Sequence, residues 1–164
     1  MIQGQGKEPV APRPDHSQKG NIHMSSNPMI KLYSFTMDCR EPARLAGFYA
    51  ALLDWDMASF DEDYACAYPK GSQQGTYPSL LFQQNPAYEP PVWPQETKAQ
   101  QQMAHLDFAV KDIDQAAEHA VHCGAKQASQ QFSENWRVMI DPEGHPFCLC
   151  DMKQVIESPH FSLL

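Results

Sequence analysis

Two pairs of side chains in this sequence have residue types and a spacing that suit metal or proton chemistry. His105 and Asp107 lie two positions apart, and so do Cys148 and Cys150. Residues i and i+2 of a β-strand project from the same face, so on strands each pair would present two neighbouring side chains. Imidazole and thiolate groups are ligands of a soft ion such as zinc, and Asp107 could orient the His105 imidazole or act as a base.

Each pair also has a plainer interpretation. Cysteine is a common small hydrophobic residue of protein cores, and a histidine and an aspartate two positions apart on a strand are as often an exposed polar face. A disulfide between Cys148 and Cys150 is not expected, because Cα atoms of residues i and i+2 lie roughly 6.5–7 Å apart, at or past the limit for that bond. The five cysteines form no CxxC pair and are odd in number, which is typical of reduced thiols.

The elements that must position these residues repeat along the chain. The run 136–150, Trp-Arg-Val-Met-Ile-Asp-Pro-Glu-Gly-His-Pro-Phe-Cys-Leu-Cys, predicts two strands joined by a tight turn. The earlier run 64–71 has the same outline, an apolar strand closed by Pro-x-Gly, and the two prolines, Pro69 and Pro142, lie 73 positions apart. A repeat of this length predicts two copies of one module.

Each half of the sequence is predicted to form a strand, a helix and three further strands. The first half gives strand 30–37, a helix with Asp38 as its cap and Pro42 in its first turn, and strands 55–60, 64–68 and 78–84. The second half gives strand 103–110, helix 112–122, and strands 126–132, 135–141 and 146–151. The sequence therefore predicts an α+β fold of two βαβββ modules, 29–84 and 103–151, with a Pro- and Gln-rich linker at 85–102.

The ends of the chain differ from the predicted domain, which spans 29–153. Residues 1–28 are rich in Gly, Pro, Gln, Ser and Lys, with almost no apolar periodicity, which predicts a disordered tail. The step from His23 to Met24 resembles a cloning junction, which leaves open whether all of the tail is native. Residues 154–164 are predicted to form an arm that packs on a neighbour or frays.

Composition and charge limit the classes of function. With 164 residues, 42% of them hydrophobic, the chain is long enough for one well-buried domain. A net charge of −8 without a clustered basic face argues against a nucleic-acid partner. Neither a bilayer-spanning apolar run nor a secretory signal is evident, so we expect a cytoplasmic protein with no membrane partner.

Three segments resemble the vicinal oxygen chelate superfamily, and within it the glyoxalase-like proteins grouped with glyoxalase, bleomycin-resistance and extradiol dioxygenase domains. The segments are 37–55 (Met-Asp-Cys-Arg-Glu-Pro-Ala-Arg-Leu-Ala-Gly-Phe-Tyr-Ala-Ala-Leu-Leu-Asp-Trp), 105–114 (His-Leu-Asp-Phe-Ala-Val-Lys-Asp-Ile-Asp) and 141–147 (Asp-Pro-Glu-Gly-His-Pro-Phe). The resemblance implies curled mixed sheets around a cavity, often completed by a second protomer, and hence a homodimer that takes a small-molecule ligand.

The resemblance also implies where a divalent metal such as Zn, Ni, Mn or Fe would bind. Its ligands would come from the first and last strand of each module and would chelate two substrate oxygens. In the second module, His105 matches the histidine ligand, and Cys148 stands where glutamate is usual.

The first module gives a poorer match. Aligning Asp38 with Asp112 places Lys31 at the ligand position, whereas aligning the helix ends places Phe35 there. Strand alternation would put both on one face, together with Tyr33. The remaining position, on the fourth strand, falls near Gln83. Neither lysine nor phenylalanine is a usual metal ligand.

Two classes of function remain open at this stage. The first is a metal-dependent lyase, isomerase or dioxygenase with His105 as a metal ligand and Asp107 or Tyr33 in proton transfer. The second, favoured by the missing glutamate, is a binding protein that encloses an aromatic or amphiphilic molecule, with Trp136 among the lining residues. The predicted ligand-binding set is Lys31, Phe35, Gln83, Trp136 and Cys150. His145, next to the Asp-Pro-Glu-Gly turn, is predicted to have a turn and surface role.

Overall fold

The computed structural model describes residues 30–73 and 78–153. From Leu32 onward they belong to one compact unit, whereas Ile30 and Lys31 belong to a separate N-terminal unit. The predicted tail 1–28 and the predicted arm 154–164 lie outside the described residues. Both of these predictions therefore stay predictions, as does the predicted domain boundary.

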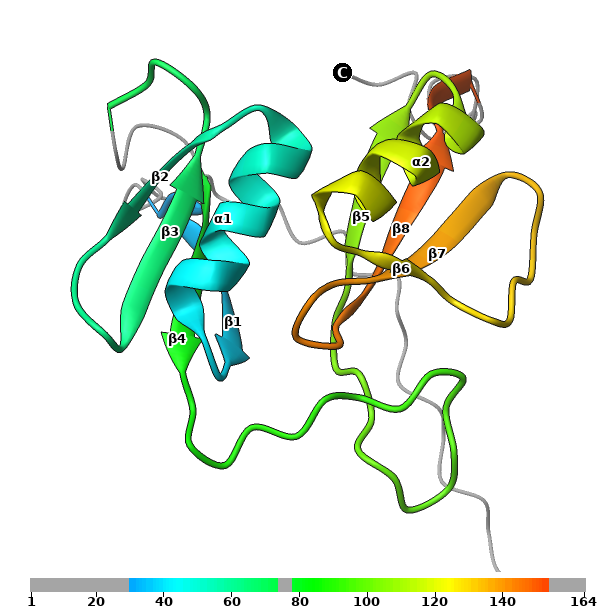
Figure 1. Cartoon of the computed structure of the whole chain (residues 1–164), viewed down its shortest axis with the longest axis horizontal. Coiled ribbons are helices and arrows are strands. Elements are labelled where there is room, and N and C mark those ends of the chain that lie inside the picture. Colours follow the sequence, from blue (N-terminus) through cyan, green and yellow to red (C-terminus); the bar gives the residue numbers. More distant parts are fainter. Residues whose placement is uncertain (1–29, 74–77, 154–164) are drawn as a thin grey trace, which may run out of the picture. The chain divides into compact units, whose positions relative to one another are not determined.

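Two modules with the same order of elements follow one another (Figure 1). The first comprises β1 (Ser34–Cys39), α1 (Pro42–Leu53), β2 (Asp56–Ser59), β3 (Tyr64–Tyr68) and β4 (Ser79–Gln84). The second comprises β5 (Leu106–Val110), α2 (Ile113–Cys123), β6 (Lys126–Gln127), β7 (Trp136–Ile140) and β8 (Pro146–Asp151). The predicted α+β fold of two βαβββ modules is confirmed.

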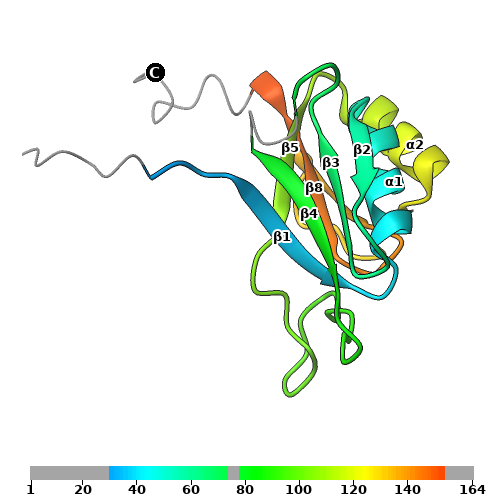
Figure 2. The ribbon, with the colours of Figure 1, turned by 90° about the vertical axis from the view of Figure 1, so that its left-hand side faces the viewer.

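Each module forms one mixed four-stranded sheet with the same topology. The strand orders are β1-β4-β3-β2 and β5-β8-β7-β6. In both sheets the first strand of the module runs parallel to the last, and the other pairs are antiparallel. Figure 2 shows β1 beside β4 in the first sheet. The first and last strands of each module are therefore direct neighbours, which brings side chains distant in sequence onto one surface.

The helix caps differ from the prediction in the first module. Asp38 does not cap α1, because β1 continues through Cys39 and pairs Asp38 with Gln83 of β4. The cap is Glu41, and Pro42 occupies the first turn, where its missing N–H costs no hydrogen bond. In α2, which was predicted to begin at residue 112, Asp112 is itself the cap, since its carboxylate accepts a hydrogen bond from the Gln115 N–H at 3.0 Å.

The strand predicted at 126–132 is cut short to Lys126–Gln127, and a side chain replaces the missing part. The Gln131 amide oxygen accepts a hydrogen bond from the Val138 N–H at 2.8 Å. Its amide nitrogen donates to the carbonyl oxygens of Val138 at 2.9 Å and Ala128 at 3.0 Å. The carboxamide thus takes the place of a backbone peptide beside β7, a substitution that apolar periodicity does not reveal.

The two modules share one core centred on Tyr49 of α1. Its ring stacks on Phe82 of β4 at a centroid distance of 5.5 Å and lies 6.3 Å from both Phe108 of β5 and Phe147 of β8. Tyr49, Phe82 and Phe147 have no exposed surface. Apolar burial on this scale, rather than the linker, holds the modules together.

Each sheet has a face that packs against the core and an opposite face, which we call the open face. In β5, Leu106, Phe108 and Val110 pack against the core, so alternation puts Asp107 and Ala109 on the open face. In β1, Met37 and Cys39 are buried, which puts Thr36 and Asp38 on the open face.

Candidate functional site

The open face of the second sheet brings three of the predicted site residues together. Asp107 of β5 lies directly opposite Cys148 of β8 in the parallel register, and Ala109 lies opposite Cys150. His105, immediately before β5, places Nε2 at 3.2 Å from the Asp107 carboxylate. One donor atom from each of His105, Asp107 and Cys148 lies within 4.8 Å of the other two. We call these three residues the open-face cluster.

The thiols at this surface are held in their protonated form. Burial, followed by the charge of Asp107 and a hydrogen bond with it, raises the pKa of Cys148 to about 12. Burial and the same carboxylate also raise the pKa of Cys150. A nucleophilic cysteine needs a lowered pKa and a cationic neighbour, so neither thiol is suited to nucleophilic catalysis.

The His105 ring is fixed from both sides. The Gln102 amide nitrogen lies 3.0 Å from Nδ1, and Nε2 faces Asp107. In this arrangement the amide donates to Nδ1, and the ring proton on Nε2 is directed to the carboxylate. The Gln102 amide oxygen is buried and, within the described parts of the chain, has no hydrogen-bond partner.

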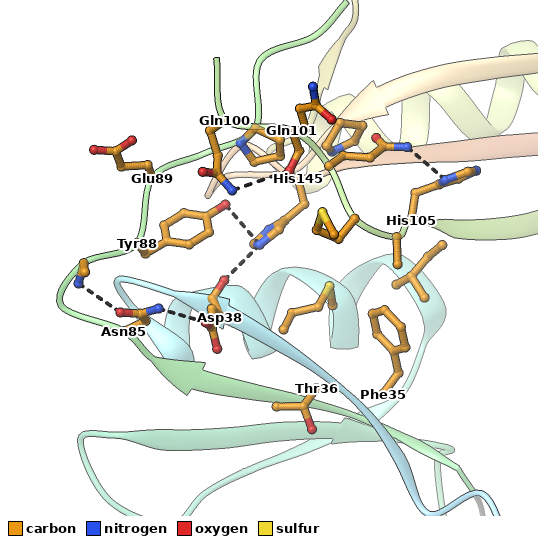
Figure 3. A pocket seen from close by; sticks show the side chains of 18 of the residues that line it. Phe35, Thr36, Asp38, Asn85, Tyr88, Glu89, Gln100, Gln101, His105 and His145 are labelled. Atoms are coloured by element: carbon orange, nitrogen blue, oxygen red, sulfur yellow. Dashed lines mark hydrogen bonds between the residues drawn. The ribbon is translucent and has the colours of Figure 1, made fainter. Parts of the chain in front are cut away.

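A cavity of about 450 Å³ lies beside the cluster, at the start of β5 (Figure 3). Its wall is built from β1, α1, the linker segments 85–91 and 100–104, and the turn before β8. Phe35, Tyr49, Tyr88, His105 and His145 are among the lining residues. His105 thus belongs to both the cavity and the open-face cluster, whereas Asp107, Cys148 and Gln83 are not among the residues that line the cavity.

His145 has a larger role than the sequence predicted. It does close the predicted turn, since its N–H donates to the Asp141 carboxylate, but the prediction of a surface residue is wrong, because its side chain is only 16% exposed. Its Nδ1 lies 2.8 Å from the fully buried Asp141 carboxylate. Its Nε2 lies 2.9 Å from the Asp38 carbonyl oxygen and 3.0 Å from the Tyr88 hydroxyl. The close-up shows this ring between Asp38 and Tyr88 (Figure 3).

The partners of His145 favour its protonated form. Burial by itself lowers the pKa of His145, but the hydrogen bond and charge of Asp141 outweigh it, and the net pKa is raised. Asp141 also accepts hydrogen bonds from the Tyr49 hydroxyl at 3.1 Å and from the N–H groups of Glu143 and His145 at 2.9 Å. The Tyr88 hydroxyl can donate to the Glu143 carbonyl oxygen at 3.1 Å. The sequence contains one sign of this network, the Asp141-Pro-Glu-Gly turn. In this turn the chain folds back, so that the N–H groups of Glu143 and His145 reach the Asp141 carboxylate.

The remaining predicted residues lie apart from the cluster. Phe35 packs against the core rather than on the open face, whereas Gln83 lies opposite Asp38 on the open face of the first sheet. Trp136 lies opposite Cys150 and is 40% exposed. Lys31 belongs to the N-terminal unit. Ligand-binding roles for these residues stay predictions.

The chain was compared with known proteins at the level of family, sequence and structure. A family model described as a glyoxalase-like domain matches residues 34–150. The chain belongs to the glyoxalase-like domain family. No curated protein sequence matches it.

Solved structures show the same fold at low sequence identity. This glyoxalase-like domain is similar to a glyoxalase/bleomycin resistance protein/dioxygenase family enzyme from Burkholderia phytofirmans, with 12% identity, a TM-score of 0.55 and coverage of 75% of this chain and 99% of that one. It is also similar to the trypanothione-dependent glyoxalase I of Leishmania major, with 14% identity, a TM-score of 0.53 and coverage of 80% and 93%. An Agrobacterium tumefaciens protein gives 17% identity, a TM-score of 0.53 and coverage of 75% and 98%. Identities this low support the fold alone.

The two modules of the glyoxalase-like domain can be superposed through their own registers. Met37 pairs with Phe82 and stands four residues before the α1 cap, as Phe108 pairs with Leu149 and stands four residues before the α2 cap. Counting from these pairs, the first-module counterparts of His105, Asp107 and Cys148 are Ser34, Thr36 and Leu81. The counterpart of His105 is therefore neither Lys31 nor Phe35. Lys31 followed from aligning Asp38 as the cap, and the true cap, Glu41, lies three residues later.

The donor set does not fit the metal that the superfamily implies. That metal would draw ligands from both modules, but Ser34 offers a neutral hydroxyl and Leu81 offers no donor atom. The second module keeps the expected histidine, His105, but has the Cys148 sulfur at the glutamate position, with the Asp107 carboxylate beside it. We therefore derive no step through a bound metal.

Proposed function

We propose that this glyoxalase-like domain binds a small, neutral or cationic amphiphilic molecule in the cavity beside His105. The observation that carries the proposal is the cavity itself, whose volume of about 450 Å³ lies within the range typical of ligand pockets. Its lining combines apolar and aromatic side chains with the amides of the linker, and the three consecutive glutamines Gln100, Gln101 and Gln102 all line it.

The charges around the cavity support this choice of ligand. The carboxylates of Asp38 and Glu89 both line it. The ring nitrogens of His145 are engaged by Asp141, Asp38 and Tyr88. An anionic ligand would therefore meet two carboxylates and an imidazole that is already paired, whereas a neutral or cationic ligand would meet no such repulsion.

The alternative function, a metal-dependent lyase, isomerase or dioxygenase, has less support. It needs ligands from the first module, where Ser34 and Leu81 stand at the matching positions. Proton transfer by Asp107 is also hindered, because this carboxylate faces His105 and Cys148 outside the cavity. Tyr33 is 59% exposed and lines a different pocket of about 310 Å³, on the open face of the first sheet.

A fluorescent probe that is neutral and amphiphilic, such as Nile red, tests the binding function. The variant Ala87→Trp puts a large ring at an exposed position of the cavity wall, and Ala51→Trp puts the same ring on the exposed side of α1. We expect saturable one-to-one binding to the unaltered protein, weakened at least about tenfold (about 1.4 kcal/mol) by Ala87→Trp and unchanged by Ala51→Trp. Equal binding by all three proteins, or no saturable binding, would refute the proposal.

We also propose that the protein is a homodimer in which the open faces are covered. Large apolar side chains are exposed on or beside these faces, among them Phe60 at 53%, Tyr64 at 37% and Trp136 at 40%. Exposed apolar patches of this kind mark interaction surfaces. Sedimentation should give twice the chain mass of 18.5 kDa, and Phe60→Glu should shift it to the monomer. A monomer at all concentrations would exclude the dimer.

None of the described helices is long and apolar enough to cross a bilayer.

A further inference from the structure

A largely apolar groove lies between the edge strand of the second sheet and the two helices. It has a volume of about 430 Å³ and is lined by Phe108 and Val110 of β5, Leu52 of α1 and Ala116 of α2, among others. We propose that residues 154–164 of the same chain dock in this groove. The proposal concerns a different part of the molecule from the small-molecule cavity and does not rest on it.

The groove exists because α2 lacks large side chains that α1 carries at matching positions. Counted from the caps Glu41 and Asp112, the matched residues are Leu45 and Ala116, Phe48 and His119, and Tyr49 and Ala120. The three residues of α1 are buried in the core, each at most 4% exposed. In α2 the two alanines are too small to fill the same space, and His119 Nε2 lies 3.3 Å from the Leu52 carbonyl oxygen. Since protein interiors contain few large voids, this groove calls for a side chain from elsewhere.

Strand β5 is incompletely covered at the same place. In the first module Met37 and Cys39 of β1 are 8% and 0% exposed, whereas their counterparts Phe108 and Val110 are only partly buried. Four consecutive residues of β5, 107–110, line the groove, which places it along the outer edge of that strand. An edge strand presents unpaired backbone N–H and C=O groups, so a docked segment would cover both apolar surface and an open edge.

Residues 154–164 start next to this groove and have a composition that suits it. Asp151, the last residue of β8, pairs with Val110, which lines the groove, and the described chain continues only to Lys153. The segment that follows, Gln-Val-Ile-Glu-Ser-Pro-His-Phe-Ser-Leu-Leu, contains five large apolar side chains and one acidic residue. Eleven residues can span up to about 36–40 Å, so Phe161 can reach even the far end of the groove.

Two other occupants have less support. Residues 1–28 precede the first module and are rich in Gly, Pro, Gln, Ser and Lys, which gives them little apolar surface to bury. A second copy of the chain is better matched to the open faces, where the aromatic residues Phe60 and Trp136 are exposed. Docking within one chain would also join the modules, because Leu52 belongs to the first and Val110 to the second.

Photo-crosslinking of the full chain tests the proposal, with p-benzoylphenylalanine in place of Phe161. We expect cross-links from this position to residues of the groove, in a product with the mass of one chain. Ala116→Phe fills the groove and should reduce their yield at least about fivefold, the effect of a competing interaction of about 1 kcal/mol. Ala43→Phe is the matched control, because it adds the same ring at an exposed position of α1, and it should leave the yield unchanged.

Thermal unfolding of the full chain is a second measurement that leaves the groove unaltered. Phe161→Asp should lower the melting temperature by about 3–8 °C, because a buried ring is replaced by a charge. Ser158→Asp adds the same charge to the same segment and should change it by no more than about 1 °C. The proposal is overturned if the cross-links join two chains or fall outside the groove, if Ala116→Phe and Ala43→Phe give equal yields, or if Phe161→Asp and Ser158→Asp unfold alike.

Discussion

The hydroxyl of Tyr49 gives the sharpest test of the buried network that links the modules. The variant Tyr49→Phe removes one oxygen atom and keeps the ring, which stacks on Phe82 at 5.5 Å and is fully buried. The lost interaction is a hydrogen bond of 3.1 Å to the Asp141 carboxylate. Hydrogen bonds to charged groups contribute about 1.5–3 kcal/mol. Because Asp141 keeps three other donors, from Glu143 and His145, we expect the lower part of that range, about 1.5–2 kcal/mol.

Urea denaturation at neutral pH measures this difference. The unfolding midpoint of Tyr49→Phe should fall with an unchanged slope, and its melting temperature should drop by about 3–8 °C for a chain of this length. Tyr64→Phe is the control, because its ring is 37% exposed, and we expect a change within about 0.5 kcal/mol. In an Asp141→Asn background the effect of Tyr49→Phe should shrink. A loss below about 0.5 kcal/mol for Tyr49→Phe would show that the hydroxyl adds nothing to the network.

Three further predictions concern the turn before β8 and the edge of β7. The pKa of His145 is raised in the folded protein. Its contribution to stability is therefore complete below the unfolded pKa of about 6.5 and is lost as the pH rises through the folded pKa. The free energy of unfolding should fall over that rise in pH. Urea titrations across this range should show the decline, and His145→Gln should flatten it; an equal slope in the variant would assign the decline to another group. Gly144→Ala should cost at least about 1–3 kcal/mol, because Gly144 has a φ of 99° and an added Cβ would lie 2.5 Å from Pro90 Cβ. If Pro90→Gly, added to Gly144→Ala, partly restores the melting temperature, the restored part is due to the clash and the remainder to backbone strain. A Gly144→Ala variant of unchanged stability would contradict both the clash and the strain. Gln131→Ala should cost about 2 kcal/mol in urea denaturation, because the buried Val138 N–H loses its acceptor. Gln131→Glu should not recover this loss, because its second oxygen would face the carbonyl oxygens of Val138 and Ala128 in place of the donating amide nitrogen.

The fold follows from patterns that a sequence displays directly. Helical spacing of apolar residues and the repeated strand and turn outline gave both modules in the right order. The ends of strands were less accurate, and the strand predicted from 103 begins only at Leu106. The length of a strand depends on how many residues of the adjacent strand can pair with it. The alternation of apolar and polar residues along one strand contains no information about the adjacent strand. The role of Gln131 was missed for a related reason, because a side chain that imitates a peptide has no periodicity.

The clustering of the candidate residues was predictable in the second module and not in the first, and their roles stay predictions. His105, Asp107 and Cys148 could be named together because the resemblance implies ligands from the first and last strand of a module, and in this chain those strands, β5 and β8, pair directly. In the first module, Lys31 differs from the register counterpart Ser34 because Asp38 was taken as the cap in place of Glu41, which moves the match by three residues. His145 was missed because its burial depends on contacts with Asp38 and Tyr88, 107 and 57 positions away in the sequence. Only the docking of the two modules creates that environment.

The position of Asp141 has a consequence for how the protein can be divided. The same carboxylate closes the turn between β7 and β8, through the N–H groups of Glu143 and His145, and receives the Tyr49 hydroxyl from the other module. Closing the hairpin and docking the modules therefore stabilise each other. We expect two fragments made by cutting the linker near the exposed Lys98 to be poorly ordered alone and to reassemble on mixing. The protein would then act as a split protein, and recovery of its tryptophan fluorescence would report that its halves have met.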